Sequence, residues 1–411
     1  MFANPLALNQ TSSSYRWVML ILCAITPLCV VTLPNLSLPP LFATIGEDLS
    51  LSLVEIGTIW GAGSFAGVFF ALIGGTLGDR FGTRTTLFVT CLMTGVLGLA
   101  RSFAIDFTTL LITSLLFGVF QAIIQIMLFK VARQWFPAEQ LGMASGVISA
   151  GFASGLLLGP LLSTSVILPA LGGWRQVLVL FGVVAILMSL VWLVIHPVDH
   201  PPATQRHARA SLGASLSHVV HLRNLWILGI GGLGISACFQ GFSGYLPTYL
   251  KSIGWESLDA DRALAAFFVT SLTAVVPLSI LSDRLRLRRG FLIFGALVLS
   301  VGIGLLSVVD GAVVVLLIAA TGCVFDSFMA ILNASVLEVE GLSELYAGTA
   351  IGFATTIRYL GGTFSPPVGN GLATLGYGVP FLFWGGMGLF AVIMFAFLLK
   401  PAKSALPDAA G

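Results

Sequence analysis

The sequence predicts an all-α membrane protein with twelve membrane-spanning helices in two six-helix halves. Of its 411 residues 57% are hydrophobic and 9% are charged, and the mean hydropathy is +1.01. A soluble domain carries roughly 25% charged residues. Twelve segments reach the length of about 20 apolar residues that a spanning helix needs. Positions in the second half of the chain also repeat positions in the first half at a nearly constant spacing.

The predicted spans share this length and a low charge content, and they are separated by short turns. They are 17–40, 53–77, 84–102, 108–130, 142–167, 175–195, 225–250, 262–282, 289–308, 312–335, 346–371 and 378–399. The only long polar stretch, 197–224, divides the chain into an N-terminal half (1–196) and a C-terminal half (225–400), with a short tail at 401–411. All five histidines lie between His196 and His221, which excludes a histidine proton relay in mid-membrane.

The basic residues of the turns indicate the orientation, because cytoplasmic loops carry an excess of Lys and Arg. One side would hold Arg16, Arg80, Arg84, Lys130, Arg133, Arg206, Arg209, Arg223, Arg284, Arg286, Arg288, Arg289, Lys400 and Lys403. The other side would hold only Arg101, Arg175, Lys251 and Arg262. We therefore expect both termini to be cytoplasmic, in a multi-pass protein of a bacterial inner membrane.

Enzymatic motifs fail their context tests. Gly229 to Gly234 spell G-x-G-x-x-G, but the run lies inside an apolar span and follows no strand, so a dinucleotide site is not predicted. The five cysteines lie in apolar segments without metal-ligand spacing. We expect no enzyme activity, no cofactor, no metal and no nucleic-acid partner.

The internal repeat concerns glycines, prolines and charged turns. Asp79-Arg80 after the second span recurs as Asp283-Arg284 after the eighth, 204 positions on. Five positions of the fifth span recur in the eleventh, 206 positions on: Gly142, Gly146, Gly155, Gly159 and Pro160 match Gly348, Gly352, Gly361, Ser365 and Pro366. Small residues allow helices to approach closely in lipid. Gly155, Gly159, Pro160, Gly361 and Pro366 are therefore predicted helix-packing positions.

One turn resembles a known family. Gly75-Thr76-Leu77-Gly78-Asp79-Arg80-Phe81-Gly82-Thr83-Arg84 resembles the G-x-L-x-D-R-x-G-R-[RK] loop between helices 2 and 3 of the major facilitator superfamily of secondary transporters, with Thr83 in place of the first basic residue after the glycine. The resemblance implies a gate formed by Gly75, Asp79, Arg80, Gly82 and Arg84, with Asp283 and Arg284 as counterparts. Asp79 would lie at the positive N-terminus of helix 11 and favour an outward-open state.

Other segments both support and qualify the resemblance. Trp135-Phe136-Pro137 resembles the family's usual loop between helices 4 and 5. In the fourth span, however, Ser114 stands where a related pattern has arginine. In the fifth span, Leu162 and Ser163 replace glycines that are common in drug/proton antiporters. Both departures weaken an antiporter interpretation.

Two charged residues are predicted in mid-membrane. Asp326 lies roughly 15 Å and Arg358 roughly 18 Å from the cytoplasmic ends of their helices at 1.5 Å per residue. A buried charge is costly unless it is paired or faces water. Either the two form a structural ion pair, or Arg358 faces a central cavity and attracts an anion while Asp326 is its gated partner or a proton carrier.

Uncharged polar residues complete the predicted site. Gln121 and Gln125 share a helix face, as do Ser236, Gln240 and Ser243. Asn35 follows Pro34, and Tyr359 follows Arg358. The resemblance implies that helices 1, 4, 7 and 10 line the cavity. Hydrogen bonding between helices is an equally good explanation for each of these residues.

Together these features predict alternating-access, proton-coupled symport of a small organic anion such as a carboxylate, by a monomer in the lipid bilayer. Efflux of drug-like or amphipathic compounds is the first alternative, and a non-transporting membrane sensor is the second.

The predicted orientation can be tested with reporter fusions. A reporter within residues 200–215 should behave as cytoplasmic, and one inserted near Glu256 as external, because the positive loops remain inside. Enzymatic activity of the two fusions on either side of the membrane is the measurement, and the reverse pattern would overturn the orientation.

Overall fold

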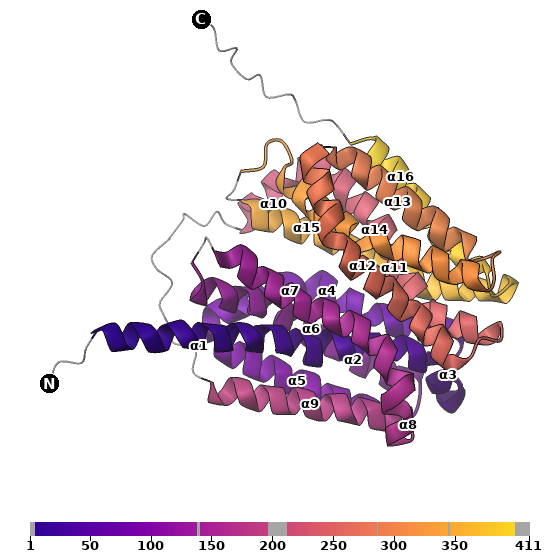
Figure 1. Cartoon of the computed structure of the whole chain (residues 1–411), viewed down its shortest axis with the longest axis horizontal. Helices are drawn as coiled ribbons and strands as arrows, with labels where there is room; N and C mark the ends of the chain where they lie inside the picture. Colours follow the sequence, from indigo (N-terminus) through magenta and orange to yellow (C-terminus); the bar gives the residue numbers. More distant parts are fainter. Residues whose placement is uncertain (1–4, 138–139, 196–211, 286, 344–345, 399–411) are drawn as a thin grey trace, which may run out of the picture.

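The protein is an almost entirely helical bundle (Figure 1). The computed structural model describes residues 5–137, 140–195, 212–285, 287–343 and 346–398, and contains no strand within them. The N-terminal half comprises α1 (Pro5–Thr26), the π-helical η1 (Pro27–Thr32), α2 (Leu33–Leu36), α3 (Leu38–Leu49), α4 (Leu53–Phe81), α5 (Thr83–Ser102), α6 (Phe107–Trp135), α7 (Leu141–Leu162), the π-helical η3 (Ser163–Ile167), α8 (Leu168–Leu171) and α9 (Trp174–Val194).

The C-terminal half comprises α10 (Leu212–Val220), α11 (Arg223–Ser252), α12 (Ser257–Leu285), α13 (Arg288–Leu305), α14 (Ala312–Leu337), α15 (Ala347–Gly371), the 3-10 turn η5 (Leu372–Leu375) and α16 (Val379–Ala396). The two sets of helices gather on opposite sides of the molecule in Figure 1. They meet where α15 packs on α4, α12 on α7 and α11 on α3.

Eleven helical segments in the described residues are long and apolar enough to cross a membrane. The expected twelfth span is α15, whose 25 residues include Arg358 and many small polar residues, and it packs between α4 and α11. The predicted number of helices and the all-α class are therefore confirmed. Several helices run past the predicted spans, as α6 does to Trp135, because polar residues can continue a helix outside the lipid.

The first predicted span is not one continuous α-helix. Pro27 begins the π-helical segment η1, and Pro34, Pro39 and Pro40 follow at the starts of α2 and α3. Proline lacks a backbone N–H and interrupts the regular i→i−4 ladder. The interruption leaves the carbonyls of Val30 and Val31 to accept side-chain hydrogen bonds.

The predicted linker is partly helical. Its residues 197–211 lie outside the described residues, whereas 212–220 form α10. His218 of α10 stacks on Tyr346 with ring centroids 4.6 Å apart, and its Nε2 lies 2.9 Å from the carbonyl oxygen of Gly341. The end of the linker therefore packs on the loop before α15.

Several of the predicted packing glycines lie at close helix approaches. Gly361 of α15 faces the carbonyl of Leu233 in α11, and Gly155 of α7 faces the hydroxyl of Thr32. A Cβ at Gly159 would lie 2.9 Å from the Cβ of Leu36. Pro160 and Pro366 are buried inside α7 and α15. The repeated glycines are not equivalent, because Gly348 has open space where a Cβ would lie.

Two substitutions in α15 test this difference. Gly361→Ala should destabilise the protein by roughly 1–3 kcal/mol, since its methyl group would overlap the backbone of α11 and force the helices apart. Gly348→Ala, in open space on the same helix, should be neutral or slightly stabilising. Thermal unfolding of the purified variants is the measurement, and equal midpoints would contradict the close approach.

Candidate functional site

A cavity of about 220 Å³ lies between the two halves. It is lined by the first span and by α4, α5, α6, α7, α11 and α15. Three of the four spans expected from the resemblance contribute, namely the first, the fourth (α6) and the seventh (α11). No lining residue comes from α14, the tenth span; α4 and α15, which meet at the seam, contribute instead.

Six of the predicted site residues are brought together in this cavity: Asn35, Gln121, Gln125, Gln240, Ser243 and Tyr359. They come from four spans far apart in the sequence. Gln121 is the most constrained, because its Nε2 donates to the carbonyls of Val30 and Val31, each at 3.1 Å. Tyr359 lies against Gly67 across the seam.

Asp326 and Arg358 do not line the cavity. The Arg358 guanidinium donates to Asn333 Oδ1 at 3.1 Å and to Thr355 Oγ1 at 2.9 Å. Asp326 lies on the α12 side of α14, where its backbone N–H donates to Ser271 Oγ at 3.1 Å. Among the ion pairs of the described residues, none joins Asp326 to Arg358, so the predicted structural pair is absent from this conformation.

Arg101 was expected on the outer side near the end of its span, and the structure shows that its side chain turns into the protein. Its side chain lines the cavity and is 2% exposed. The guanidinium carbon lies 4.6 Å from the ring centroid of Phe117 on α6. The last turn of α5 aims the long side chain inward, which a position near a span end does not reveal. The only feature of the sequence that pointed to this position was the polar face of α6, which lines the same cavity as Arg101.

Contacts between the halves gather at the end of the bundle where α3 ends and α9 begins. Following the predicted orientation, we refer to it as the outer end. Trp60 Nε1 of α4 donates to the Gln240 carbonyl at 2.8 Å, and Asn370 Nδ2 of α15 donates to the Leu53 carbonyl at 2.8 Å. These bonds, with Gly57 against Pro366, separate the cavity from the outer end.

An ion pair strengthens this closure. Lys251 Nζ lies 3.1 Å from Oδ1 of Asp261, which is 1% exposed. The same Nζ donates to the Pro40 carbonyl at 2.8 Å, and the Thr164 hydroxyl donates to Asp261. Pro40 and Thr164 belong to the N-terminal half, whereas Lys251 and Asp261 belong to the C-terminal half. One polar cluster therefore ties both halves at the outer end.

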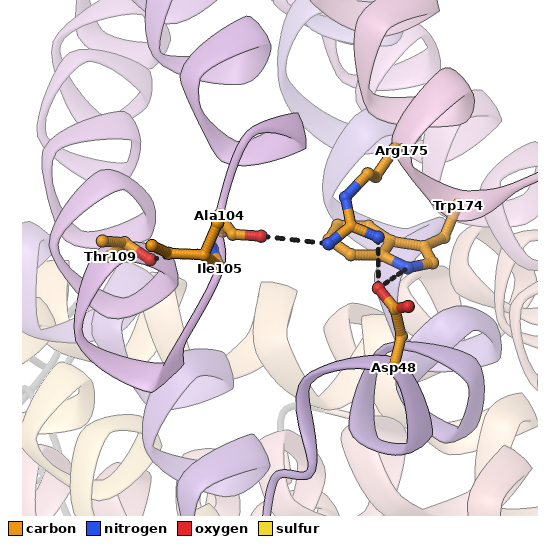
Figure 2. A network of polar contacts seen from close by, with 6 residues as sticks. All are labelled: Asp48, Ala104, Ile105, Thr109, Trp174 and Arg175. Carbon is orange, nitrogen blue, oxygen red and sulfur yellow. Dashed lines mark hydrogen bonds and ion pairs between the residues drawn. The ribbon is translucent and has the colours of Figure 1, made fainter.

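A second polar network holds the outer end of the N-terminal half (Figure 2). Arg175 of α9 pairs with Asp48 of α3 and donates to the Ala104 carbonyl at 3.1 Å, while Trp174 Nε1 donates to Asp48 at 3.1 Å. The hydrogen bond from Arg175 holds the pKa of the Asp48 carboxyl below its usual range. The stabilising effect of the Arg175–Asp48 contact is present at neutral pH and is lost as the pH falls through the lowered pKa of Asp48.

The predicted gate lies at the opposite end. Gly82 adopts φ +79°, which suits the tight turn between α4 and α5. Arg84 donates to the Leu193 carbonyl at the C-terminal end of α9. A cation is favourable there because the final carbonyls carry partial negative charge. Arg80 and Arg284 are exposed.

The rest of the gate prediction is untested. The side chains of Asp79 and Asp283, together with Gly75, lie outside the described side chains, so the expected contact of Asp79 with α15 stays a prediction.

The closed outer end, the cavity between two helical halves and the apolar spans define a polytopic membrane transporter. The chain belongs to the Major Facilitator Superfamily, whose family model matches residues 28–260 and 263–411. The fold is similar to that of a bacterial homologue of the human lysosomal transporter Spinster in an inward-facing, unoccupied conformation. The TM-score is 0.75 at 14% identity, over 93% of this chain and 95% of that one.

Relatives of known name are transporters rather than enzymes. A probable sulfoacetate transporter of Cupriavidus necator is 24% identical over 84% of each chain. A D-galactonate transporter of Escherichia coli is 24% identical over 67% of this chain and 69% of its own. A hexuronate transporter of Bacillus subtilis is 28% identical, but the match spans only 36% of this chain and 35% of that protein.

Two carboxylates on α12 test the outer closure. Asp261→Asn should weaken the cluster that ties the halves and raise the outward-open population roughly fivefold, the equivalent of about 1 kcal/mol. Labelling of Ser64→Cys by an external, impermeant thiol reagent, in a background without other cysteines, is the measurement.

Asp259→Asn is the matched control, because Asp259 forms only an exposed pair with Arg262 at 3.4 Å on the same helix. It should leave the labelling rate unchanged. Equal rates in the two variants would show that the cluster does not hold the outer end closed.

Proposed function

We propose that the protein transports a small organic anion by proton-coupled alternating access. The observation that carries the proposal is the charge of the cavity: among the described residues that line it, Arg101 is the only charged one, and the others are polar or apolar. A cavity with a fixed positive charge and no acid favours an anionic ligand, because Coulomb attraction is strong where water is scarce.

The dimensions favour a small substrate over a drug-like one. Sites for drug-sized ligands measure about 300–1,000 Å³. The cavity here is smaller, at about 220 Å³, and residues with amide or hydroxyl groups line it from five spans. Efflux of amphipathic compounds is therefore the less favoured function.

The relatives support the anionic class. Those named above are transporters of a hexuronate, of D-galactonate and, in the probable case, of sulfoacetate. All three names denote small organic acids. Identity is low, so the relatives support the class of substrate and not one compound.

We assign the coupling proton to Asp326. It is an acid in the middle of α14, and it lies against α12 rather than against the lining of the cavity. Arg358 lies on the neighbouring α15 with neutral partners, Asn333 and Thr355. A monomer with both termini in the cytoplasm and two moving halves, 1–196 and 225–400, completes the proposal.

The proposal predicts acid-driven uptake in proteoliposomes. A carboxylate from a panel of labelled sugar acids and aromatic acids should accumulate when the outside is acidic, and a protonophore should abolish accumulation. Asp326→Asn should lose accumulation but retain exchange of substrate across the membrane, because only the proton step is removed.

Glu340→Gln serves as the control, since it removes an exposed carboxyl group from the loop before α15. It should accumulate substrate normally. If no carboxylate of the panel is transported by the wild type, the anion proposal is wrong. If Asp326→Asn still accumulates substrate against a gradient, the proton is carried elsewhere.

A further inference from the structure

Arg101 is a buried cation without a protein counter-charge. Its side chain is 2% exposed, and its Nε has no hydrogen-bond partner. Within the described residues no carboxylate forms an ion pair with it. Its guanidinium carbon lies 4.6 Å from the ring centroid of Phe117, in a cation–π contact. Lys251, in contrast, is partly buried and has Asp261.

Such an arrangement is costly for an unliganded protein. Removing a charge from water is unfavourable unless a partner restores the lost interactions. Attraction to an aromatic face returns only a small part of this free energy. None of the described residues that line the cavity is an acid that could supply the rest. A ligand that brings its own negative charge would complete the site.

The surroundings hold the guanidinium in place. Arg101 lies one residue before the end of α5, and the next turn is held by the bond from Arg175 to the Ala104 carbonyl (Figure 2). The capping box of Asp106 and Thr109 then starts α6, which carries Phe117 two turns on. The outer network therefore orients both the helix that bears Arg101 and the ring against which it stacks.

Gln121 adds a second recognition element on the same face of α6. It lies one helical turn beyond Phe117, and both line the cavity. Its Nε2 donates to two backbone carbonyls of η1, so the reverse orientation of the amide would place oxygen against oxygen. The amide oxygen is therefore left as a fixed acceptor, which suits a hydroxyl donor rather than a second carboxylate.

We propose that Arg101 anchors the carboxylate of the substrate, and that Gln121 accepts a hydrogen bond from a substrate hydroxyl, so that the cavity takes a small hydroxylated carboxylic acid. The planar fork of arginine matches the two oxygens of a carboxylate. This assignment rests on the proposed transport of an organic anion. It adds the anchoring residue, which lies in the N-terminal half.

The competing explanation is that Arg101 only fastens α5 to α6 through Phe117. The two explanations differ in the unliganded protein. If Arg101 is an uncompensated charge, Arg101→Met should leave the midpoint of thermal unfolding unchanged or raise it. If Arg101 is a structural clamp, the same substitution should lower the midpoint.

The experiment measures thermal unfolding of the purified full-length protein with D-galactonate and, as a matched uncharged polyol, with galactitol. Only ligands of the native state raise the midpoint. D-Galactonate should stabilise the wild type and galactitol should not. Arg101→Met should weaken D-galactonate binding at least tenfold. The affinity of Arg101→Lys for D-galactonate should lie between those of the wild type and Arg101→Met. Hexanoate, which has the carboxylate without hydroxyls, should stabilise the wild type less than D-galactonate.

Arg262→Met is the matched control, because it removes an exposed arginine near the outer end of α12. It should bind D-galactonate as the wild type does. Equal binding by Arg101→Met and the wild type, or a lower unliganded midpoint for Arg101→Met, would overturn the assignment while leaving anion transport intact. Equal stabilisation by hexanoate and D-galactonate would refute the role of Gln121. If D-galactonate and hexanoate both fail to stabilise the wild type, the carboxylate site is refuted together with the proposed class.

Discussion

A charged side chain inside a membrane protein needs a counter-charge, a polar partner or a ligand, because lipid provides none of these. The chain meets this requirement in three ways. Lys251 pairs with Asp261 at the outer end. Arg358 donates to the neutral side chains of Asn333 and Thr355. Arg101 faces the cavity with an aromatic ring and no acid. The first arrangement holds the halves together, and the third leaves a place for an anion.

The low polarity of the lipid also explains how the two halves pack against each other. The hydrophobic effect does not drive helices together in lipid, so close packing and interhelical hydrogen bonds must do so. At the seam, glycines of α4 such as Gly57 and Gly61 face the backbone of α15 directly. The bonds from Trp60 and Asn370 end on backbone carbonyls of the opposite half.

Closure of the outer end and ligand binding in the polar cavity are linked, because both depend on how the two halves are placed. Opening outward would break the Lys251 contact with Pro40 and the Thr164 contact with Asp261, and would admit water to a pair that is now buried. The substrate must provide the difference in free energy between the two states, since a ligand shifts an equilibrium only by its differential affinity. An anion held between Arg101 in one half and polar groups of α11 in the other would contact both bodies when they are closed together.

The sequence alone determined the all-α class, the number of spans and the family resemblance, because these depend on composition, period and local turn chemistry. It also selected Gln121, Gln125, Asn35, Gln240 and Tyr359, which are polar residues inside apolar spans and now line one cavity. Only the tertiary structure decided the direction of each long charged side chain. Arg101 turns inward from a span end, whereas Arg358 turns towards α14 and away from the lining. Such a side chain can reach either water or protein from the same helical position, and the neighbouring helices decide which it reaches.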